Sequence, residues 1–189
     1  MLNFLKQFIL HPKDTGAIWP TGNDLARLIV QLAELETAKS IVEFGPGTGV
    51  ITQKIIEELP VNSTFFSIEK NKEFYYVFKK KFPNIEVFND SASNIVNLLK
   101  DSGLPNCDRI ISGLPWASFS DELQTEIIEA AYKALRSKGI FVTFSYLHSR
   151  VIPSGARFVK LLRHTFKNVE RSQIVWQNIP PAFVYKCIK

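Results

Sequence analysis

A glycine-rich turn is the part of this sequence best suited to hold a ligand. It reads Gly45-Pro46-Gly47-Thr48-Gly49, and it follows a short apolar run that carries the acidic Glu43. Glycine allows tight backbone angles and lets a ligand lie against bare main chain. A helical pattern begins directly after the turn, where unpaired N–H groups are available. The spacing is neither the dinucleotide fingerprint nor the phosphate loop. A strand, a glycine turn and a helix in this order predict a nucleotide-binding corner, although such a triplet can also be a purely structural turn.

Further candidate residues follow the next three apolar runs of the chain. Ligands bind open α/β sheets beyond the carboxyl ends of the strands, so these positions share one site if the runs are parallel strands. A carboxylate about 20 residues past the glycine turn can accept hydrogen bonds from both hydroxyls of a ribose. The alternative is that an acidic residue at one of these positions, taken alone, is an ordinary solvated loop residue. The candidate segments are Glu69-Lys70, Asp90-Ser91 and Ser112-Gly113-Leu114-Pro115-Trp116.

The strands and helices that would position these residues alternate along the chain. Such alternation implies parallel strands with right-handed crossovers. The last two strands leave no room for a helix between them, so they should form an antiparallel hairpin at one edge of the sheet. The expected strands are 40–44, 64–68, 85–88, 109–112, 140–146, 169–176 and 182–188. The expected helices are 48–59, 72–82, 93–101, 118–135 and 158–165, preceded by one that begins near residue 23.

Two local signals set the expected bounds of the 118–135 helix. Ser118 and Asp121 match the capping-box pattern, which predicts where the helix begins. Gly139 suits the left-handed position that follows a helix C-terminus, so we expect Lys138 and Gly139 to end the helix.

The composition narrows the class of protein. A chain of 189 residues favours one domain, and 46% apolar residues are enough for a substantial core. The longest apolar stretches are about five residues, far below the ~20 that cross a bilayer, and no cleavable signal pattern is visible. Cys107 and Cys187 are too few for a disulfide framework and lack metal spacing, so we expect no metal site and a cytoplasmic location. The net charge of +5 favours an anionic partner, nucleic acid or an acidic membrane surface, over a basic enzyme without one.

The pattern E-x-G-x-G-x-G at 43–49 resembles the first motif of S-adenosylmethionine-dependent methyltransferases. The resemblance implies a Rossmann-like class I fold: a seven-stranded, mostly parallel sheet with an antiparallel C-terminal hairpin and helices on both faces. It also implies S-adenosylmethionine as the cofactor. In this family the glycine loop lies under the amino-acid part of the cofactor, the position of Glu43 is near the methionine amine, and that of Asp90 holds the adenine amino group. The residues expected to bind the cofactor are Glu43, Gly45, Pro46, Gly47, Thr48, Gly49, Glu69, Lys70, Asp90, Ser91 and Ser112.

The segment after the fourth strand indicates an amine acceptor. Enzymes of the ribosomal-RNA adenine dimethylase type carry Asn-Leu-Pro-Tyr there, and the Asn orients the target amine while the aromatic ring stacks on the base. This chain keeps Leu114, Pro115 and an aromatic residue but has Gly113 in place of the Asn, which argues against adenine methylation. Trp116 offers a π face to a cationic methylated amine, or else belongs to the core. We assign Gly113, Leu114, Pro115, Trp116 and Tyr146 to the reacting end of the site.

Three segments together resemble bacterial phospholipid N-methyltransferases, which convert phosphatidylethanolamine stepwise towards phosphatidylcholine. They are S-G-L-P-W at 112–116, G-A-I-W-P-T at 16–21 and W-Q-N-I-P-P-A-F-V-Y at 176–185. The resemblance implies a phosphatidylethanolamine acceptor and an enzyme at the inner face of the cytoplasmic membrane, and we expect a monomer. An RNA adenine N6-methyltransferase and a methyltransferase of a soluble small molecule or peptide are the alternatives.

The N-terminal residues predict a membrane contact. Residues 2–10 form a short amphipathic pattern, and a helix with an apolar face and basic neighbours lies in the membrane interface. The alternative is that this helix caps the sheet or covers the cofactor. We therefore divide the chain into an N-terminal segment, 1–22, and a methyltransferase domain, 23–189. A second basic cluster adds attraction to lipid phosphate or RNA, unless it is only a solvated helix face: Arg150, Arg157, Lys160, Arg163, His164 and Lys167.

Overall fold

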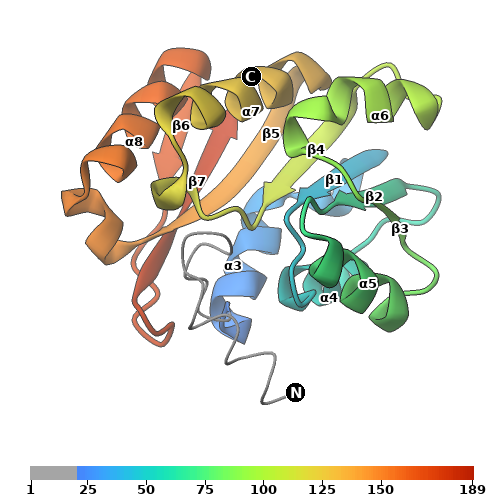
Figure 1. Ribbon diagram of the computed structural model, residues 1–189, viewed down its shortest axis with the longest axis horizontal. Helices are drawn as coiled ribbons and strands as arrows, with labels where there is room; N and C mark the ends of the chain where they lie inside the picture. The colour runs from blue at the N-terminus through green and yellow to red at the C-terminus, as the bar shows by residue number, and fades with distance from the viewer. Residues whose placement is uncertain (1–20) are drawn as a thin grey trace.

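The computed structural model describes residues 21–189 and arranges them around one seven-stranded sheet (Figure 1). The strands are β1 (Ser40–Phe44), β2 (Thr64–Ile68), β3 (Glu86–Phe88), β4 (Cys107–Ser112), β5 (Leu135–Tyr146), β6 (Asn168–Arg171) and β7 (Ala182–Ile188). Their order is β3-β2-β1-β4-β5-β7-β6, with β7 antiparallel to both neighbours and the other pairs parallel. The predicted fold and its antiparallel C-terminal hairpin are confirmed. The predicted helix over 2–10, and residues 1–20 of the 1–22 segment, lie outside the described residues.

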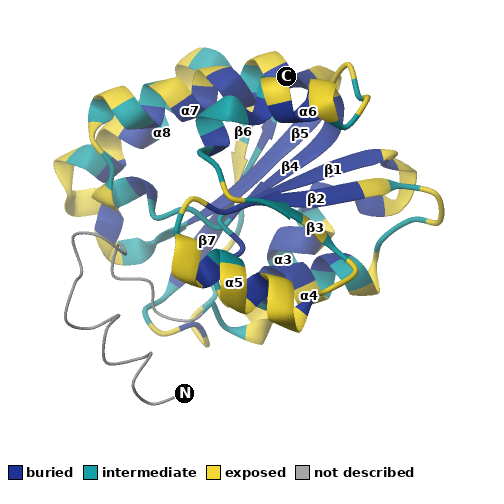
Figure 2. Cartoon of the chain, turned by 45° about the vertical axis from the view of Figure 1, so that its right-hand side comes forward, coloured by how far each residue is buried: buried dark blue, intermediate teal, exposed yellow. Residues whose placement is uncertain are grey.

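Helices cover both faces of the sheet (Figure 1). On one face lie α3 (Asn23–Ala33), α4 (Val50–Glu57) and α5 (Lys72–Lys81), and on the other α6 (Ile95–Asp101), α7 (Asp121–Ala134) and α8 (Pro153–Thr165). Successive residues of a strand point to opposite faces, so Ile41 packs into the core under α3 and α4 while Val42 packs into the core under α6, α7 and α8. The central strands β1 and β4 are therefore buried throughout (Figure 2).

The bounds of α7 differ from the prediction at both ends. The helix begins at Asp121, and the hydroxyl of Ser120, not of Ser118, accepts a hydrogen bond from the Leu123 N–H. Ser118 instead ends a short 3-10 helix, Trp116–Ser118. At the other end the chain passes directly from Ala134 into β5, and the residue with positive φ is Lys138, at 61°. Gly139 lies beside a shift of register between β4 and β5, where a Cβ would come 2.9 Å from the Arg136 carbonyl oxygen.

Asp108 ties together the starts of three central strands. One of its carboxylate oxygens accepts hydrogen bonds from the N–H groups of Lys39, at 2.7 Å, and Ser40, at 3.0 Å. The other accepts a hydrogen bond from Arg136 at the start of β5. Although partial burial alone would raise the pKa of Asp108, these hydrogen bonds lower it below its usual value. The carboxylate thus fixes β1, β4 and β5 at the edge of the sheet opposite the candidate site.

Candidate active site

The glycine turn after β1 is held in a conformation that favours glycine at three positions. Gly45, Gly47 and Gly49 have φ values of +63°, +54° and +78°. A Cβ at Gly49 would lie 2.2 Å from the ring of Phe82, so this glycine allows the turn to pack against the end of α5. A Cβ at Gly47 would meet no heavy atom within 4 Å. The turn is therefore closely packed at its end and open at its centre, where a ligand can lie against main chain.

Glu43 lies beneath this turn and is fully buried. Its carboxylate accepts hydrogen bonds from the hydroxyls of Thr52 on α4, at 2.8 Å, and Ser67 on β2, at 2.9 Å. Burial raises the pKa of Glu43 to about 7, although both hydroxyls favour the ionised form. The side chain thus joins β1, β2 and α4 under the turn, and its contact with the methionine amine of a cofactor stays a prediction.

Glu69 joins the end of β2 to the glycine turn. Its Oε2 accepts a hydrogen bond from the N–H of Gly47 at 3.2 Å, and its Oε1 accepts one from the N–H of Asn71 at 2.9 Å. Burial raises the pKa of this carboxyl above its usual value, and the two N–H groups oppose that shift. Two of the predicted cofactor-binding positions are therefore in direct contact, at the open part of the turn.

Asp90 and Ser91 follow β3 at the same edge of the sheet. The Asp90 carboxylate accepts hydrogen bonds from the N–H of Ser91 and the side-chain amide of Asn94, both at 2.6 Å. Asn89, which the sequence analysis missed, donates to the carbonyl oxygens of Glu69 at 2.8 Å and Lys70 at 3.1 Å. It aligns the ends of β2 and β3, and only the strand register reveals this role. The side chain of Lys70 itself is exposed.

Gly113 brings the segment after β4 against the glycine turn. Its N–H donates to the carbonyl oxygen of Phe44 at 2.8 Å, and a Cβ at this position would lie only 2.7 Å from the carbonyl oxygen of Gly45. The buried Ser112 accepts a hydrogen bond from the N–H of Leu114 at 3.3 Å. This main-chain contact leaves no room for a side chain at 113, and an Asn there would displace the turn.

Trp116 does not present the open aromatic face that the sequence analysis allowed. Its side chain is 2% exposed and its ring stacks on Phe158, with the ring centroids 4.5 Å apart. The indole N–H donates to the Thr143 hydroxyl at 2.7 Å. The ring belongs to the core and also contributes to the wall of the cavity described below.

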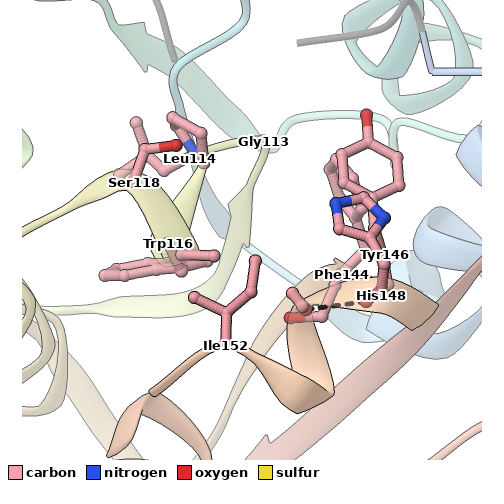
Figure 3. Close-up of a pocket in the computed structure, with 12 residues that line it drawn as sticks. Gly113, Leu114, Trp116, Ser118, Phe144, Tyr146, His148 and Ile152 are labelled. Atoms are coloured by element: carbon pink, nitrogen blue, oxygen red, sulfur yellow. Dashed lines mark hydrogen bonds between the residues drawn. The ribbon is translucent and has the colours of Figure 1, made fainter. Parts of the chain in front are cut away.

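A cavity of about 150 Å³ opens where β4 and β5 end (Figure 3). The rings of Tyr146 and His148 stack in parallel on one side of it, with centroids 5.6 Å apart, and burial raises the pKa of Tyr146 to about 12. None of the described residues that line the cavity is Asp, Glu, Lys or Arg. The lining residues are Gly113, Leu114, Pro115, Trp116, Ala117, Ser118, Phe144, Ser145, Tyr146, His148, Ser149 and Ile152.

The cavity wall contains residues that the sequence analysis missed. Ser149 and Ile152 belong to the 3-10 helix Leu147–Val151 and to the residue that follows it. Only the return of the chain after β5 places them opposite the 113–118 segment, so no local pattern could have identified them. The structure thus brings the predicted acceptor residues, from Gly113 to Trp116, together with Tyr146 around one cavity.

The described residues were also compared with the requirements of a metal site and of a membrane-spanning helix. Within residues 21–189, no group of three or more His, Cys, Asp or Glu side chains is placed to hold a metal ion. None of the helices described here has the length and apolarity needed to span a bilayer.

Comparisons with known proteins agree with this architecture. No protein-family model matches the sequence. The chain is 26% identical to the ornithine lipid N-methyltransferase of Singulisphaera acidiphila, over 97% of this chain and 93% of that protein. It is 27% identical to the ribosomal RNA small subunit methyltransferase A of a Hydrogenobaculum species over 61% of this chain, and it spans only 43% of that relative's length.

Methyltransferases are among the solved structures that share this fold. The O-methyltransferase TomG from Streptomyces achromogenes, solved in complex with S-adenosylmethionine, matches 97% of this chain and 88% of its own with a TM-score of 0.72 at 17% identity. The N-methyltransferase NodS from Bradyrhizobium japonicum matches 88% of this chain and 94% of its own with a TM-score of 0.70 at 13% identity. By fold and by sequence relationship, this chain is a class I S-adenosylmethionine-dependent methyltransferase.

Proposed function

We propose that this enzyme transfers a methyl group from S-adenosylmethionine to the amine of a membrane lipid, and that it methylates phosphatidylethanolamine towards phosphatidylcholine at the cytoplasmic membrane surface. The observation that carries the proposal is the cavity between the 113–118 segment and Tyr146, which has no Asp, Glu, Lys or Arg among its described lining residues and lies directly beside the glycine turn. The similarity to an ornithine lipid N-methyltransferase over nearly the whole chain supports a lipid amine as the acceptor.

The glycine turn and Glu69 fit the proposed cofactor. The open space above Gly47 admits a ligand, and the Glu69 carboxylate beside it can accept hydrogen bonds from ribose hydroxyls. We expect Gly47→Trp to abolish S-adenosylmethionine binding because the indole fills this space, with a stability loss of only about 1 kcal/mol for a side chain at positive φ. Isothermal titration calorimetry measures the affinity, and unchanged binding would remove the turn from the cofactor site.

The cavity favours the reactive form of the acceptor. The bound cofactor supplies a methyl group on a positively charged sulfur, which is a good leaving group. A partly buried cavity without Asp or Glu side chains offers no carboxylate to stabilise an ammonium ion, so it lowers the pKa of a bound amine and favours the neutral nucleophile. Main-chain carbonyls of the 113–115 segment can accept the amine hydrogens. The new N–C bond forms as the S–C bond breaks, the bonding electron pair stays on sulfur, and the amine proton leaves to solvent. Positioning is therefore the main contribution of the protein.

Adenine in RNA fits this site less well. The adenine dimethylases use an Asn side chain to orient the target amine, and the contact between Gly113 and the Gly45 carbonyl leaves no space for one. The similarity to ribosomal RNA methyltransferases also covers less of the chain than the similarity to the lipid enzyme. A soluble small molecule or peptide is the other alternative, because the cavity alone does not require a lipid tail.

Methyl transfer from labelled S-adenosylmethionine tests the proposal. Separate reactions would offer phosphatidylethanolamine vesicles that contain phosphatidylglycerol, the same vesicles with ornithine lipid in place of phosphatidylethanolamine, ribosomal RNA and small soluble amines. We expect label in phosphatidylethanolamine, with mono-, di- and trimethyl products resolved by chromatography. Label only in ornithine lipid would change the acceptor and keep the lipid class. Label only in RNA or in the soluble amines, with cofactor binding intact, would overturn the proposal.

A further inference from the structure

Four exposed apolar side chains lie at the edge of the molecule where β5 ends and β7 begins. Val151 and Ile152, at the end of the 3-10 helix that follows β5, are 87% and 37% exposed. Trp176 and Ile179, in the loop between β6 and β7, are 63% and 74% exposed. We term these four residues the docking edge. Large apolar side chains grouped on a surface mark an interaction site.

The docking edge adjoins the mouth of the cavity. Ile152 itself lines the cavity. The two segments that carry the edge are joined, because the N–H of Leu147 donates to the carbonyl oxygen of Pro181 at 2.8 Å and Tyr146 pairs with Ala182. In Figure 1 both segments leave the same end of the sheet, below α8. A surface that contacts the docking edge therefore also faces the cavity.

The C-terminal part of the chain, which carries this edge, is strongly basic. Residues 130–189 contain eleven Lys and Arg residues and one acidic residue, Glu170, which gives a formal charge of +10. The remaining residues, 1–129, carry twelve basic and seventeen acidic side chains, a formal charge of −5. Arg150 is exposed directly beside Val151, and the exposed face of α8 adds Lys160 and Arg163. An apolar edge with basic neighbours complements an anionic bilayer, where each basic residue near the surface adds attraction.

We propose that the docking edge lies against an anionic lipid bilayer and inserts its four side chains at the level of the head groups. This inference rests on the proposed lipid acceptor and specifies how the enzyme reaches it. Aliphatic side chains gain free energy at the boundary of the acyl chains, whereas nucleic acid is bound by phosphate contacts and aromatic stacking. Three of the four side chains are aliphatic, so the edge matches a bilayer better than RNA. Docking in this way would point the cavity mouth at the lipid amines.

Vesicle binding tests the docking edge with a matched control. The variant Val151→Ser with Trp176→Ser removes two exposed side chains of the edge, and the control Val61→Ser with Tyr76→Ser removes two exposed side chains, 91% and 67% exposed, outside the edge. We expect the first variant to bind vesicles of phosphatidylethanolamine and phosphatidylglycerol at least about tenfold more weakly than the wild type, because apolar area in the interface sets the affinity. The control should bind as the wild type does.

A fluorescent label gives an independent readout. Cys107 and Cys187 are buried, so a dye on the exposed position of Gln177→Cys would report from the edge alone. We expect its emission to shift to the blue on vesicles, and that of a dye on Val61→Cys to stay unchanged. Equal vesicle binding by both double variants, or an unshifted dye at Gln177→Cys, would overturn the docking edge, as would binding to RNA without any binding to vesicles.

Activity separates this inference from the proposed function. With phosphatidylethanolamine dispersed in detergent, the Val151→Ser and Trp176→Ser variant should methylate as fast as the wild type, while its rate on vesicles falls with its binding. If the wild type binds vesicles through the edge but methylates no lipid, the proposed acceptor fails and the docking edge stands. If the variant loses activity equally in detergent and on vesicles while binding vesicles normally, the edge serves catalysis and the docking inference fails.

Discussion

Packing against the glycine turn requires a glycine at position 113, independently of any role that this residue has in the acceptor site. We expect Gly113→Ala to lower the free energy of unfolding by about 1–3 kcal/mol, because the new Cβ would lie 2.7 Å from a main-chain oxygen that cannot rotate away. It should also weaken S-adenosylmethionine binding, since the displaced oxygen belongs to the glycine turn. Urea unfolding and calorimetry measure the two effects.

Gly47→Ala is the control for this prediction. The turn gives its Cβ open space, so only the cost of a positive φ remains, about 1 kcal/mol. If the alanine at 113 costs no more than the alanine at 47, the contact between the two loops is not as close as described.

The buried carboxyl of Glu43 makes stability depend on pH. Burial raises its pKa from the ordinary 4.5 to about 7 in the folded chain. Between these values the folded chain keeps a proton that the unfolded chain has released, so stability falls as pH rises and the loss, about 3 kcal/mol, is complete above pH 7. Glu43→Gln cannot titrate, and we expect it to flatten the fall in unfolding free energy between about pH 5 and 8. Parallel pH profiles for the two proteins would show that Glu43 titrates normally. The raised pKa of Glu69 acts in the same direction and persists in both.

At the scale of elements, Asp108 is the residue that holds the starts of β1, β4 and β5 together. We expect Asp108→Ala to lower the free energy of unfolding by about 2–3 kcal/mol, because the N–H groups of Lys39 and Ser40 lose their acceptor beside a buried strand. Arg136→Ala removes only the half-exposed partner of the carboxylate and should cost less than about 1 kcal/mol. Equal losses in urea unfolding would mean that the ion pair, and not the main chain, gives Asp108 its importance.

The elements also show what the sequence can and cannot reveal. The strands 40–44, 64–68 and 182–188 were predicted to the residue because apolar runs there end at polar or turn residues on both sides. The predicted start of α7 was wrong because Ser118 and Ser120 both precede acidic residues, and the local pattern does not distinguish them. In the structure Ser118 ends the 3-10 helix that begins at Trp116, whose ring stacks on the distant Phe158, and Ser120 caps α7.

Some residues of the site can likewise be predicted from the sequence, and others cannot. Its strand-end residues follow from the alternation of strands and helices, since parallel strands carry their carboxyl ends to one edge. Ile152 and Asn89 could not be found, because their roles depend on which distant segments become neighbours. The sequence did not decide whether Trp116 faces the acceptor or belongs to the core, because a glycine-leucine-proline-tryptophan segment does not show how deeply the ring is buried.

The molecule as a whole keeps both of its cysteines out of solvent. Cys107 and Cys187 lie in different strands of the same core, and burial raises the pKa of each thiol well above its ordinary range. We expect a thiol reagent to modify neither residue in the folded enzyme on the timescale of minutes, and to modify both at the same rate as the core opens. Labelling followed by mass spectrometry over a series of urea concentrations measures this. Rapid labelling of one cysteine alone would reveal that the β4 and β7 regions open independently.

Charge is divided unevenly along the chain, with a formal +10 over residues 130–189, which carry the docking edge, and −5 over residues 1–129. A negatively charged surface attracts one end of such a molecule and repels the other, so the enzyme turns during its approach, before any atom touches. This steering acts over about one Debye length, roughly 8 Å at physiological ionic strength. More collisions would then begin with the basic C-terminal part of the chain forward, which carries the docking edge, and added salt would slow productive encounters by randomising the direction of arrival, even where it leaves the chemistry of the bound state unchanged.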